Sequence, residues 1–440
     1  MSMSTYAFLR RSQPVPVEYR SVFRHLYWDI AWYGVLSGSA IAFLTVYATR
    51  LGASPFMVGL LTAGPAVINL MFTLPTGRWL ESRPIGPAVF WSSVFNRFFY
   101  LIWVVIPWLF LPQGQLWAFV LVTLLMSIPG TALSVGFNAL FAEAVPTEWR
   151  GHVTGIRNAV LSVAFVAATL VSGQILARVA FPLNYQIVFA IGLLGAAMSS
   201  VHVYFVRPVG GHSEDPSSWR NLGDLASPGR LRGAVSGVRT SVGLRFLVSK
   251  QRVRSLLRFE ILSGPFGIVL LGLFAFHLAQ YLAIPLFPLV WVNDLNFSDD
   301  LISFSQALFY VAVFVGSTQL SRLVKRFGNQ RVTAAGVLLL ALYPAISAVM
   351  RGPFLFMVVS LLGGAAWSLV GGGIANYILD RTPHDDRPAH LAWYNLALNG
   401  AILLGALGGP LLADVVGITA ALFIAAGARA ISGVYIWRRG

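Results

Sequence analysis

The sequence predicts an all-α membrane protein whose twelve transmembrane helices form two pseudo-symmetric six-helix bundles. Three observations lead to this fold class: an apolar composition, twelve long apolar runs, and a one-sided distribution of Lys and Arg. The 440 residues are 57% apolar and 11% charged, whereas soluble domains average about 25% charged residues. A water-soluble chain of this length could not bury so many apolar side chains, because its surface must face water.

The apolar runs set the number of helices. Crossing the hydrocarbon core takes about 20 apolar residues, and the backbone there must be helical to satisfy its own polar groups. The predicted spans are 27–49, 56–76, 87–110, 116–141, 153–178, 183–206, 264–290, 301–320, 332–350, 354–378, 389–413 and 417–437.

Lys and Arg orient these spans. The loops on the side of both termini hold most of the 31 basic residues, whereas the opposite loops hold only Arg50, Arg178 and Arg351. Cytoplasmic loops carry such an excess, so we expect a cell-membrane protein with both termini in the cytoplasm. This location explains the formal charge of +15 without a nucleic-acid partner. Arg97 and Arg429 lie within spans, and we expect both to extend toward lipid headgroups.

The same pattern divides the chain into segments. We expect a cytoplasmic N-terminal segment (1–26), a first bundle (27–206), a basic cytoplasmic linker (207–263), a second bundle (264–437) and a cytoplasmic C-terminus (438–440). Within the linker, residues 230–257 mix basic and apolar side chains. That composition suits a surface helix bound to anionic membrane lipid, and a solvated linker is the alternative.

The two halves share sequence at matching positions. At an offset of 244 residues, 51–54 pairs with 295–298 and 77–84 pairs with 321–328. At an offset of 237, 143–150 pairs with 380–387, with an acid, a Pro, a second acid and an Arg in register. We therefore predict that the chain consists of two related halves of six spans each.

These features resemble the major facilitator superfamily over about residues 25–437. The inner loop Gly77-x-x-x-Glu81 is similar to a family motif, but Ser82 stands where the family has Arg, and Lys325 replaces the acid in the second half. These departures leave the subgroup open. The resemblance implies a monomer that works by alternating access, with a mid-plane site lined by the first, fourth, seventh and tenth spans.

Polar and aromatic residues on those four spans are the substrate-cavity candidates. They are Tyr33, Ser37, Thr131, Ser134, His277, Gln280, Tyr281, Trp367 and Asn376. Such a wall suits a small neutral or amphiphilic organic molecule. For each residue alone, helix packing is the alternative.

Two titratable residues are candidates for proton coupling. Asp29 lies among aromatic residues of the first span; it could carry a proton, pair with Arg157, or reach interfacial water from the first turn. His277 in the seventh span could couple protons, bind substrate, or be a hydrogen-bonded packing residue.

Charged residues of the inner loops are the cytoplasmic gate candidates. They are Arg78, Glu81, Arg83, Glu143, Arg150, Arg322, Arg326, Asp380 and Arg387. We expect Glu143 to pair with Arg78 or Arg83, and Asp380 with Arg322 or Arg326, in the outward-facing state; interfacial flanking charges are the alternative. The glycines Gly371, Gly372 and Gly373 are expected to interrupt the tenth span as a hinge.

The function class follows from what is present and what is missing. The sequence has no G-x-x-x-x-G-K-[ST] loop for ATP, so an ion gradient or the solute itself would supply the energy. The seven His are scattered and Cys is absent, so neither an enzyme, a metal site nor a cofactor is expected. We therefore predict a secondary transporter of a small organic molecule, with proton coupling open; a receptor or scaffold without flux, or a lipid transporter, is the alternative.

Overall fold

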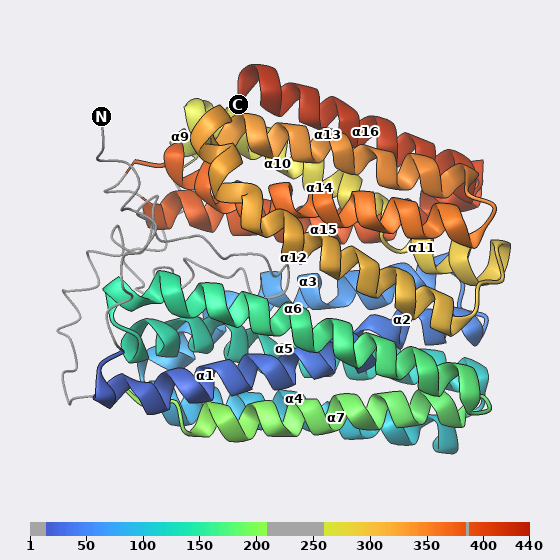
Figure 1. Ribbon diagram of the computed structural model, residues 1–440, viewed down its shortest axis with the longest axis horizontal. Coiled ribbons are helices and arrows are strands. Elements are labelled where there is room, and N and C mark those ends of the chain that lie inside the picture. Colours follow the sequence, from blue (N-terminus) through green and yellow to red (C-terminus); the bar gives the residue numbers. More distant parts are fainter. Residues whose placement is uncertain (1–14, 209–258, 384–386) are drawn as a thin grey trace, which may run out of the picture.

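The computed structural model describes residues 15–208, 259–383 and 387–440, and in these ranges the protein is a bundle of long helices (Figure 1). Twelve of the described helical stretches are long and apolar enough to cross a membrane, which confirms the predicted number of spans. The elements of the first half are α1 (Val17–Leu36), the π-helical turn η2 (Ser37–Ile41), α2 (Ala42–Arg50), α3 (Pro55–Glu81), α4 (Ile85–Leu109), α5 (Pro112–Ala144), α6 (Thr147–Arg178) and α7 (Leu183–Tyr204).

The second half repeats this layout. Its elements are α9 (Glu260–Ser263), α10 (Pro265–Ala283), α11 (Leu286–Leu289), η5 (Val290–Asp294), α12 (Asp299–Phe327), α13 (Asn329–Val349), α14 (Pro353–Asp380), α15 (Arg387–Val416) and α16 (Ile418–Arg439). The first span runs through α1, η2 and α2, and the seventh through α10, α11 and η5. The predicted surface helix at 230–257 lies outside the described residues.

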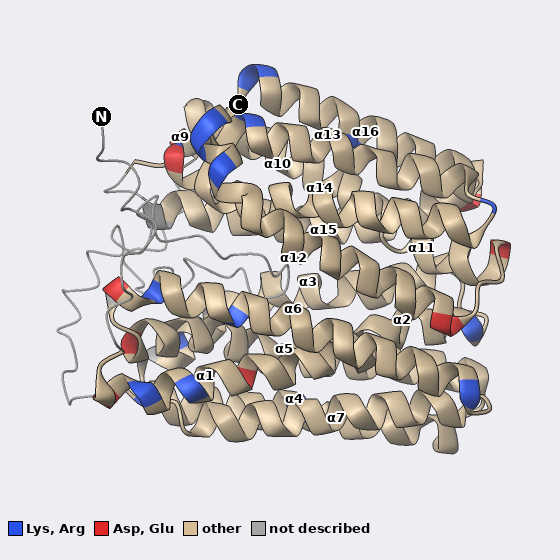
Figure 2. Cartoon of the chain, in the orientation of Figure 1, with Lys and Arg blue, Asp and Glu red and all other residues tan. Residues whose placement is uncertain are grey.

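The start of α1 and the end of α16 lie at the same end of the bundle (Figure 1). We call this the basic end; it also holds the α3–α4 and α5–α6 connections. We call the other end, with the α2–α3 and η5–α12 turns, the distal end. Figure 2 shows that charged residues gather at the two ends and that few lie along the middle of the helices. This is the distribution that a hydrocarbon solvent imposes, because a charge at mid-depth is costly.

The first helix begins at Val17, ten residues before the predicted span at 27. Val22, Phe23 and Leu26 are buried in a cluster with residues of α4, α5 and α7 at the basic end. The composition of 17–26 is too polar for a span, but tertiary packing extends the helix through it.

The distal turns confirm the internal repeat in three dimensions. Gly52 has φ +81°, and Asn296, the matching residue of the second half, has φ +50°. In both turns the backbone therefore adopts the left-handed conformation that Gly and Asn tolerate best. Two residues later, Ser54 and Ser298 are the N-caps of α3 and α12. The shared sequence therefore encodes a shared turn.

The two halves meet along two helix pairs, α3 with α15 and α6 with α12. A Cβ on Gly59 would lie 2.3 Å from the Ala406 carbonyl oxygen, and one on Gly173 would lie 2.5 Å from Ser303. Only glycine permits such approach of the helices, and both positions lie in the distal part of their helices. In Figure 1, α6 and α12 run closest at the distal end and diverge toward the basic end.

The hydrophobic clusters also join the two halves at the distal end and keep them separate toward the basic end. One cluster at the distal end joins residues of both halves, including Phe43, Val58, Leu289 and Ile302. Toward the basic end each half has its own cluster: one contains only residues of the first half, the other only residues of the second. Among the described residues, the apolar packing that joins the halves is therefore concentrated at the distal end.

The tenth span is not interrupted. α14 is one continuous helix from Pro353 to Asp380, so the prediction that Gly371, Gly372 and Gly373 break it is wrong. A Cβ on Gly373 would come within 2.5 Å of the Thr333 hydroxyl on α13. At Gly373 the absence of a side chain thus permits close packing of two helices.

Candidate functional site

Four side chains from four helices form a buried charge cluster inside the first half. An Arg157 Nη2–H of α6 donates to the Asp29 carboxylate of α1 at 3.2 Å, and the Ser199 hydroxyl of α7 donates to the other Asp29 oxygen at 2.6 Å. An Arg97 Nη2–H of α4 donates to the Ser199 hydroxyl oxygen at 3.2 Å. Asp29 has no exposed surface, and Arg97 and Arg157 are 3% and 6% exposed.

Aromatic rings surround both guanidinium groups. Arg97 lies over the Tyr33 ring at 5.6 Å, and Arg157 lies over Phe137 at 4.6 Å and Phe141 at 5.6 Å. A planar guanidinium is more weakly hydrated than an ammonium and stacks on aromatic faces. These contacts explain how two arginines are accommodated at this depth.

The cluster tests two expectations drawn from the sequence. Asp29 pairs with Arg157, and the alternative that it reaches interfacial water is wrong, because its carboxylate is fully buried and bonded to α6 and α7. The expectation that Arg97 extends to the headgroups is also wrong, because Ser199 and Tyr33 hold its guanidinium inside the bundle.

Tyr33 lies near the boundary between the halves. The next residue of α1, Gly34, packs against α6, where a Cβ on it would lie 3.3 Å from the Phe165 backbone nitrogen. Phe165 stacks on Tyr310 of α12 with ring centroids 3.8 Å apart. A candidate cavity residue of the first span, over whose ring Arg97 lies, is therefore close to a contact between the two halves.

The second half holds a different set of polar side chains. His277 of α10 is buried, with its Nε2 3.1 Å from the Tyr394 hydroxyl of α15. Tyr281, one turn further on, lies against Gly405 of α15, and Gln280 is half-buried. The hydrogen bond shows that His277 packs α10 against α15.

Arg429 of α16 is the buried guanidinium among the described residues of the second half. It is 1% exposed and donates to the Leu340 carbonyl oxygen of α13 at 2.8 Å. The expectation that it extends to the headgroups is therefore wrong as well.

The other cavity candidates are mainly engaged within their own half. Thr131 donates to the Asn69 amide oxygen of α3 at 2.7 Å, which joins α3 to α5. Ser37 is buried within η2, and Ser134 is half-buried. Trp367 lies beside Gly371 of the next turn, and Asn376 faces the Gly372 carbonyl oxygen at 3.4 Å.

A polar network closes the distal end. Arg50 of α2 donates from Nε and Nη2 to one Asp299 oxygen of α12 at 3.2 and 2.9 Å, and from Nη2 to the Phe297 carbonyl oxygen. The Tyr185 hydroxyl of α7 donates to the other Asp299 oxygen at 2.8 Å. We call Arg50, Tyr185, Phe297 and Asp299 the distal network; it joins first-half helices to the start of α12.

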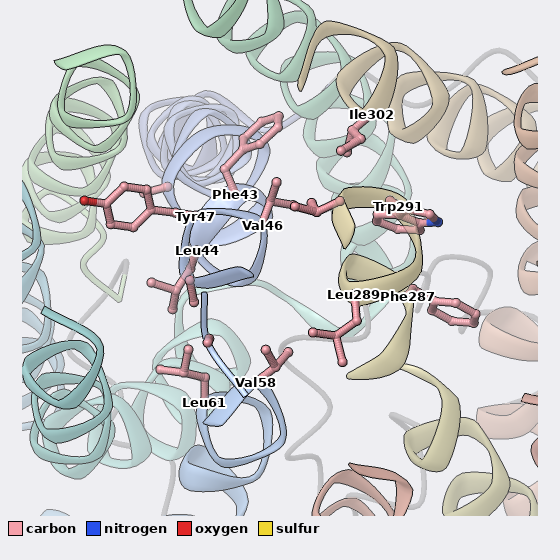
Figure 3. Packing of buried hydrophobic residues seen from close by; sticks show 14 of the residues in the cluster. Phe43, Leu44, Val46, Tyr47, Val58, Leu61, Phe287, Leu289, Trp291 and Ile302 are labelled. Atoms are coloured by element: carbon pink, nitrogen blue, oxygen red, sulfur yellow. The ribbon is translucent and has the colours of Figure 1, made fainter. Parts of the chain in front are cut away.

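Apolar side chains pack beneath the distal network. Figure 3 shows Phe43 and Val46 of α2 on one side and Leu289, Trp291 and Ile302 of the second half on the other. Sequence reasoning missed this site. The available signal was that Arg50 is one of only three basic residues on its side of the membrane.

The gate candidates of the second half lie at the basic end. Asp380 accepts a hydrogen bond from Asn329 at 2.6 Å, so the predicted pair with Arg322 or Arg326 is not formed here. Arg322 bonds to Gln319, and Arg326 lies over the Phe327 ring. Both arginines therefore contact residues of their own helix, close in sequence.

The matching arginines of the first half also contact residues close to them in sequence. Arg83 lies over the Trp79 ring, and Arg150 donates to the Ala142 and Val145 carbonyl oxygens at the end of α5. Arg78 and Glu143 are exposed. The side chains of Glu81 and Arg387 are outside what the structure describes. Among the described residues, no group of three or more His, Asp or Glu could hold a metal ion.

Comparisons with known proteins agree with this architecture. The family model described as Major Facilitator Superfamily matches residues 31–267 and 269–439. No curated protein sequence matches. Among solved structures, a bacterial homologue of the iron transporter ferroportin in its inward-facing state is 14% identical with a TM-score of 0.68, covering 97% of this chain and 99% of that one. Its outward-facing state has a TM-score of 0.59.

Two further transporters have similar scores. A variant of the nucleoside transporter NupG is 13% identical with a TM-score of 0.66, covering 94% of this chain and 99% of that one. The xylose transporter XylE from E. coli, in a partially occluded inward-open conformation, is 14% identical with a TM-score of 0.65, covering 96% and 98%. At these identities the likeness shows the fold alone.

Proposed function

The chain belongs to the major facilitator superfamily and is a secondary transporter, and we propose that it carries a small organic solute across the membrane by alternating access between its basic and distal ends. The proposed solute site lies near the middle of the bundle, at the boundary between the halves where the Tyr310 ring of α12 stacks on Phe165 of α6. In this family's fold, such a site is reached from one side at a time.

The observation that carries this proposal is the asymmetry of the contact between the halves. Apolar packing and the distal network join them at the distal end, whereas each half keeps its own core at the basic end. This is the arrangement expected of a carrier closed on one side. The better score against the inward-facing ferroportin homologue supports the same assignment.

We further propose that the basic end faces the cytoplasm of a cell-membrane protein. The excess of Lys and Arg in the loops of that end supports this orientation. The conformation would then be inward-facing. The gate candidates would form their predicted pairs, Glu143 with Arg78 or Arg83 and Asp380 with Arg322 or Arg326, in the outward-facing state, which fits the present contacts of the arginines with residues close in sequence.

Asp29 is the proposed coupling residue. It is the one carboxylate among the buried charged side chains of the described chain. Protonation of Asp29 would weaken its ion pair with Arg157 and so change the packing of α1 against α6. His277 is a weaker candidate, because its bond to Tyr394 already gives it a packing role.

Counterflow in liposomes tests the proposal. Purified protein is reconstituted with an unlabelled solute inside, and uptake of the labelled solute is followed. A transporter gives transient accumulation above equilibrium, which neither a receptor nor a scaffold can produce. Binding of a solute without counterflow would refute transport and favour the receptor alternative.

A further inference from the structure

Two histidines of the first half meet at the basic end. His25 of α1 and His202 of α7 are 177 residues apart in the sequence, yet their Nδ1 atoms lie 3.0 Å from each other. The two helices pack side by side (Figure 1). The two Nδ1 atoms therefore face one another across the contact between α1 and α7.

Packing holds both imidazole rings in place. Phe205 of α7 stacks on the His25 ring with centroids 4.9 Å apart, and Trp28 of α1 stacks on the His202 ring at 6.1 Å. Each helix thus supplies a histidine and, three residues later, an aromatic ring that covers the histidine of the other helix. Neighbouring residues on both helices are buried in one apolar cluster, namely Phe23, Leu26, Val203 and Val206. The pair is preorganised by its surroundings.

The separation of the two nitrogens suits a shared metal ion. Because a metal ion binds imidazole nitrogen at about 2.0–2.1 Å, two nitrogens in adjacent positions around one ion lie about 2.8–3.4 Å apart. The observed 3.0 Å is within this range. Without an ion, one ring must donate its Nδ1–H to the lone pair of the other, and a metal ion takes the place of that shared proton. Imidazole suits Zn²⁺, Cu²⁺ and Ni²⁺.

The pair is accessible but has only two protein ligands. Both histidines are half-buried, so an ion can enter from water at the basic end. In the part of the chain that the structure describes, no group of three or more His, Asp or Glu could hold a metal ion, so water would fill the remaining positions. Such a site binds its ion more weakly than a structural site with four protein ligands.

We infer that His25 and His202 form a binding site for a divalent transition-metal ion, Zn²⁺ or Cu²⁺, that links the start of α1 to the end of α7. This inference goes beyond the proposed transport function and does not depend on it. The site lies within the first half, away from the boundary between the halves. A bound ion would fix the basic end of the first span against α7.

Copper binding tests the inference. Full-length protein is purified without a polyhistidine tag and titrated with Cu²⁺ iminodiacetate, a chelate that leaves neighbouring positions on the ion free. The chain has no Cys, so thiolates do not compete for the ion. We expect one Cu²⁺ per chain by calorimetry and an electron paramagnetic resonance spectrum with hyperfine splitting from two imidazole nitrogens. This spectrum needs no variant, and splitting from one imidazole or none would overturn the inference.

Substitutions locate the site. His25→Gln and His202→Gln should each lower the affinity about ten-fold or more, since loss of even an outer partner of a metal site typically costs about 10- to 100-fold. His152→Gln is the matched control, because His152 is exposed near the start of α6 and lies beside Trp149. It should leave the affinity unchanged.

A second readout is the melting temperature with and without Zn²⁺. An ion that binds only the folded protein raises it, so Zn²⁺ should stabilise the parent and His152→Gln but neither variant of the pair. The metal-free melt shows that each variant is folded. Unchanged binding in both variants of the pair, or an equal loss in His152→Gln, would overturn the assignment. Counterflow is not part of the test, so failure of the metal site leaves the transport proposal standing.

Discussion

Removal of the Asp299 carboxylate should open the distal end. In the present conformation Arg50 donates two hydrogen bonds to Asp299, and Tyr185 donates a third. Charge-assisted bonds contribute about 1.5–3 kcal/mol each when buried. The Arg50 side chain is 26% exposed, so solvent offsets part of this. We expect the distal network to favour closure by about 1–3 kcal/mol in total, which corresponds to about a 5- to 150-fold change in the ratio of the two states.

Spin-label distances across the distal end measure this shift. The chain has no Cys, so labels can be placed at Ser54→Cys and Ser298→Cys without background; both positions are exposed. The parent should give one short distance, and Asp299→Ala should add a longer one.

A neighbouring carboxylate provides the control. Asp300→Ala removes the same charge one residue away, from a side chain with no hydrogen bond or ion pair in the described part of the chain, and should keep the short distance. The charge-exchanged variant Arg50→Asp/Asp299→Arg should recover part of the closure. An unchanged distribution in Asp299→Ala, or an equal shift in Asp300→Ala, would refute the reasoning.

Four further outcomes follow from the contacts. Gly373→Leu should destabilise the protein by about 1–3 kcal/mol through overpacking against Thr333, whereas Gly371→Ala should be tolerated; thermal unfolding in detergent compares them. Thr131→Val should lose the bond to Asn69 at a cost of about 1 kcal/mol, and an unchanged melting temperature would contradict this. Asp29→Asn should abolish any dependence of counterflow on a proton gradient, while His277→Gln should lower stability and leave that dependence intact; the reverse result would exchange their roles. Ser82→Cys should react with a membrane-impermeant maleimide only from the cytoplasmic side of sealed cells or vesicles, and labelling from outside would refute the proposed orientation.

The number of spans and the two-half layout could be predicted because the membrane imposes them locally. Each span needs its own apolar run, and the shared turn at Gly52 and Asn296 needs residues that accept positive φ. The start of α1 at Val17 could not be predicted, since it depends on burial against helices far away in sequence.

The candidate site could be predicted only in part. Pairing of Asp29 with Arg157 was one of several alternatives, because the sequence places both near the same end of neighbouring spans. The burial of Arg97 depends on Ser199, 102 residues later, and no local pattern identifies that partner. The distal network joins Arg50 to Asp299 across 249 residues, so no local pattern identifies the pair.

The continuity of α14 shows a different limit. A run of three glycines predicts a break when the helix is considered alone. Packing of Gly373 against Thr333 of α13 gives the glycine a role that keeps the helix intact. Tertiary contact thus outweighs the local preference.

Alternating access is tested most directly by following both ends of one reconstituted protein. One label pair is Ser54→Cys with Ser298→Cys at the distal end, and the other is Ser82→Cys with Lys325→Cys at the basic end; all four positions are exposed. On addition of a solute that shows counterflow, the distal distance should lengthen as the basic distance shortens, in the same fraction of molecules. If both distances stay constant, or if both change in the same direction, the protein does not work by alternating access.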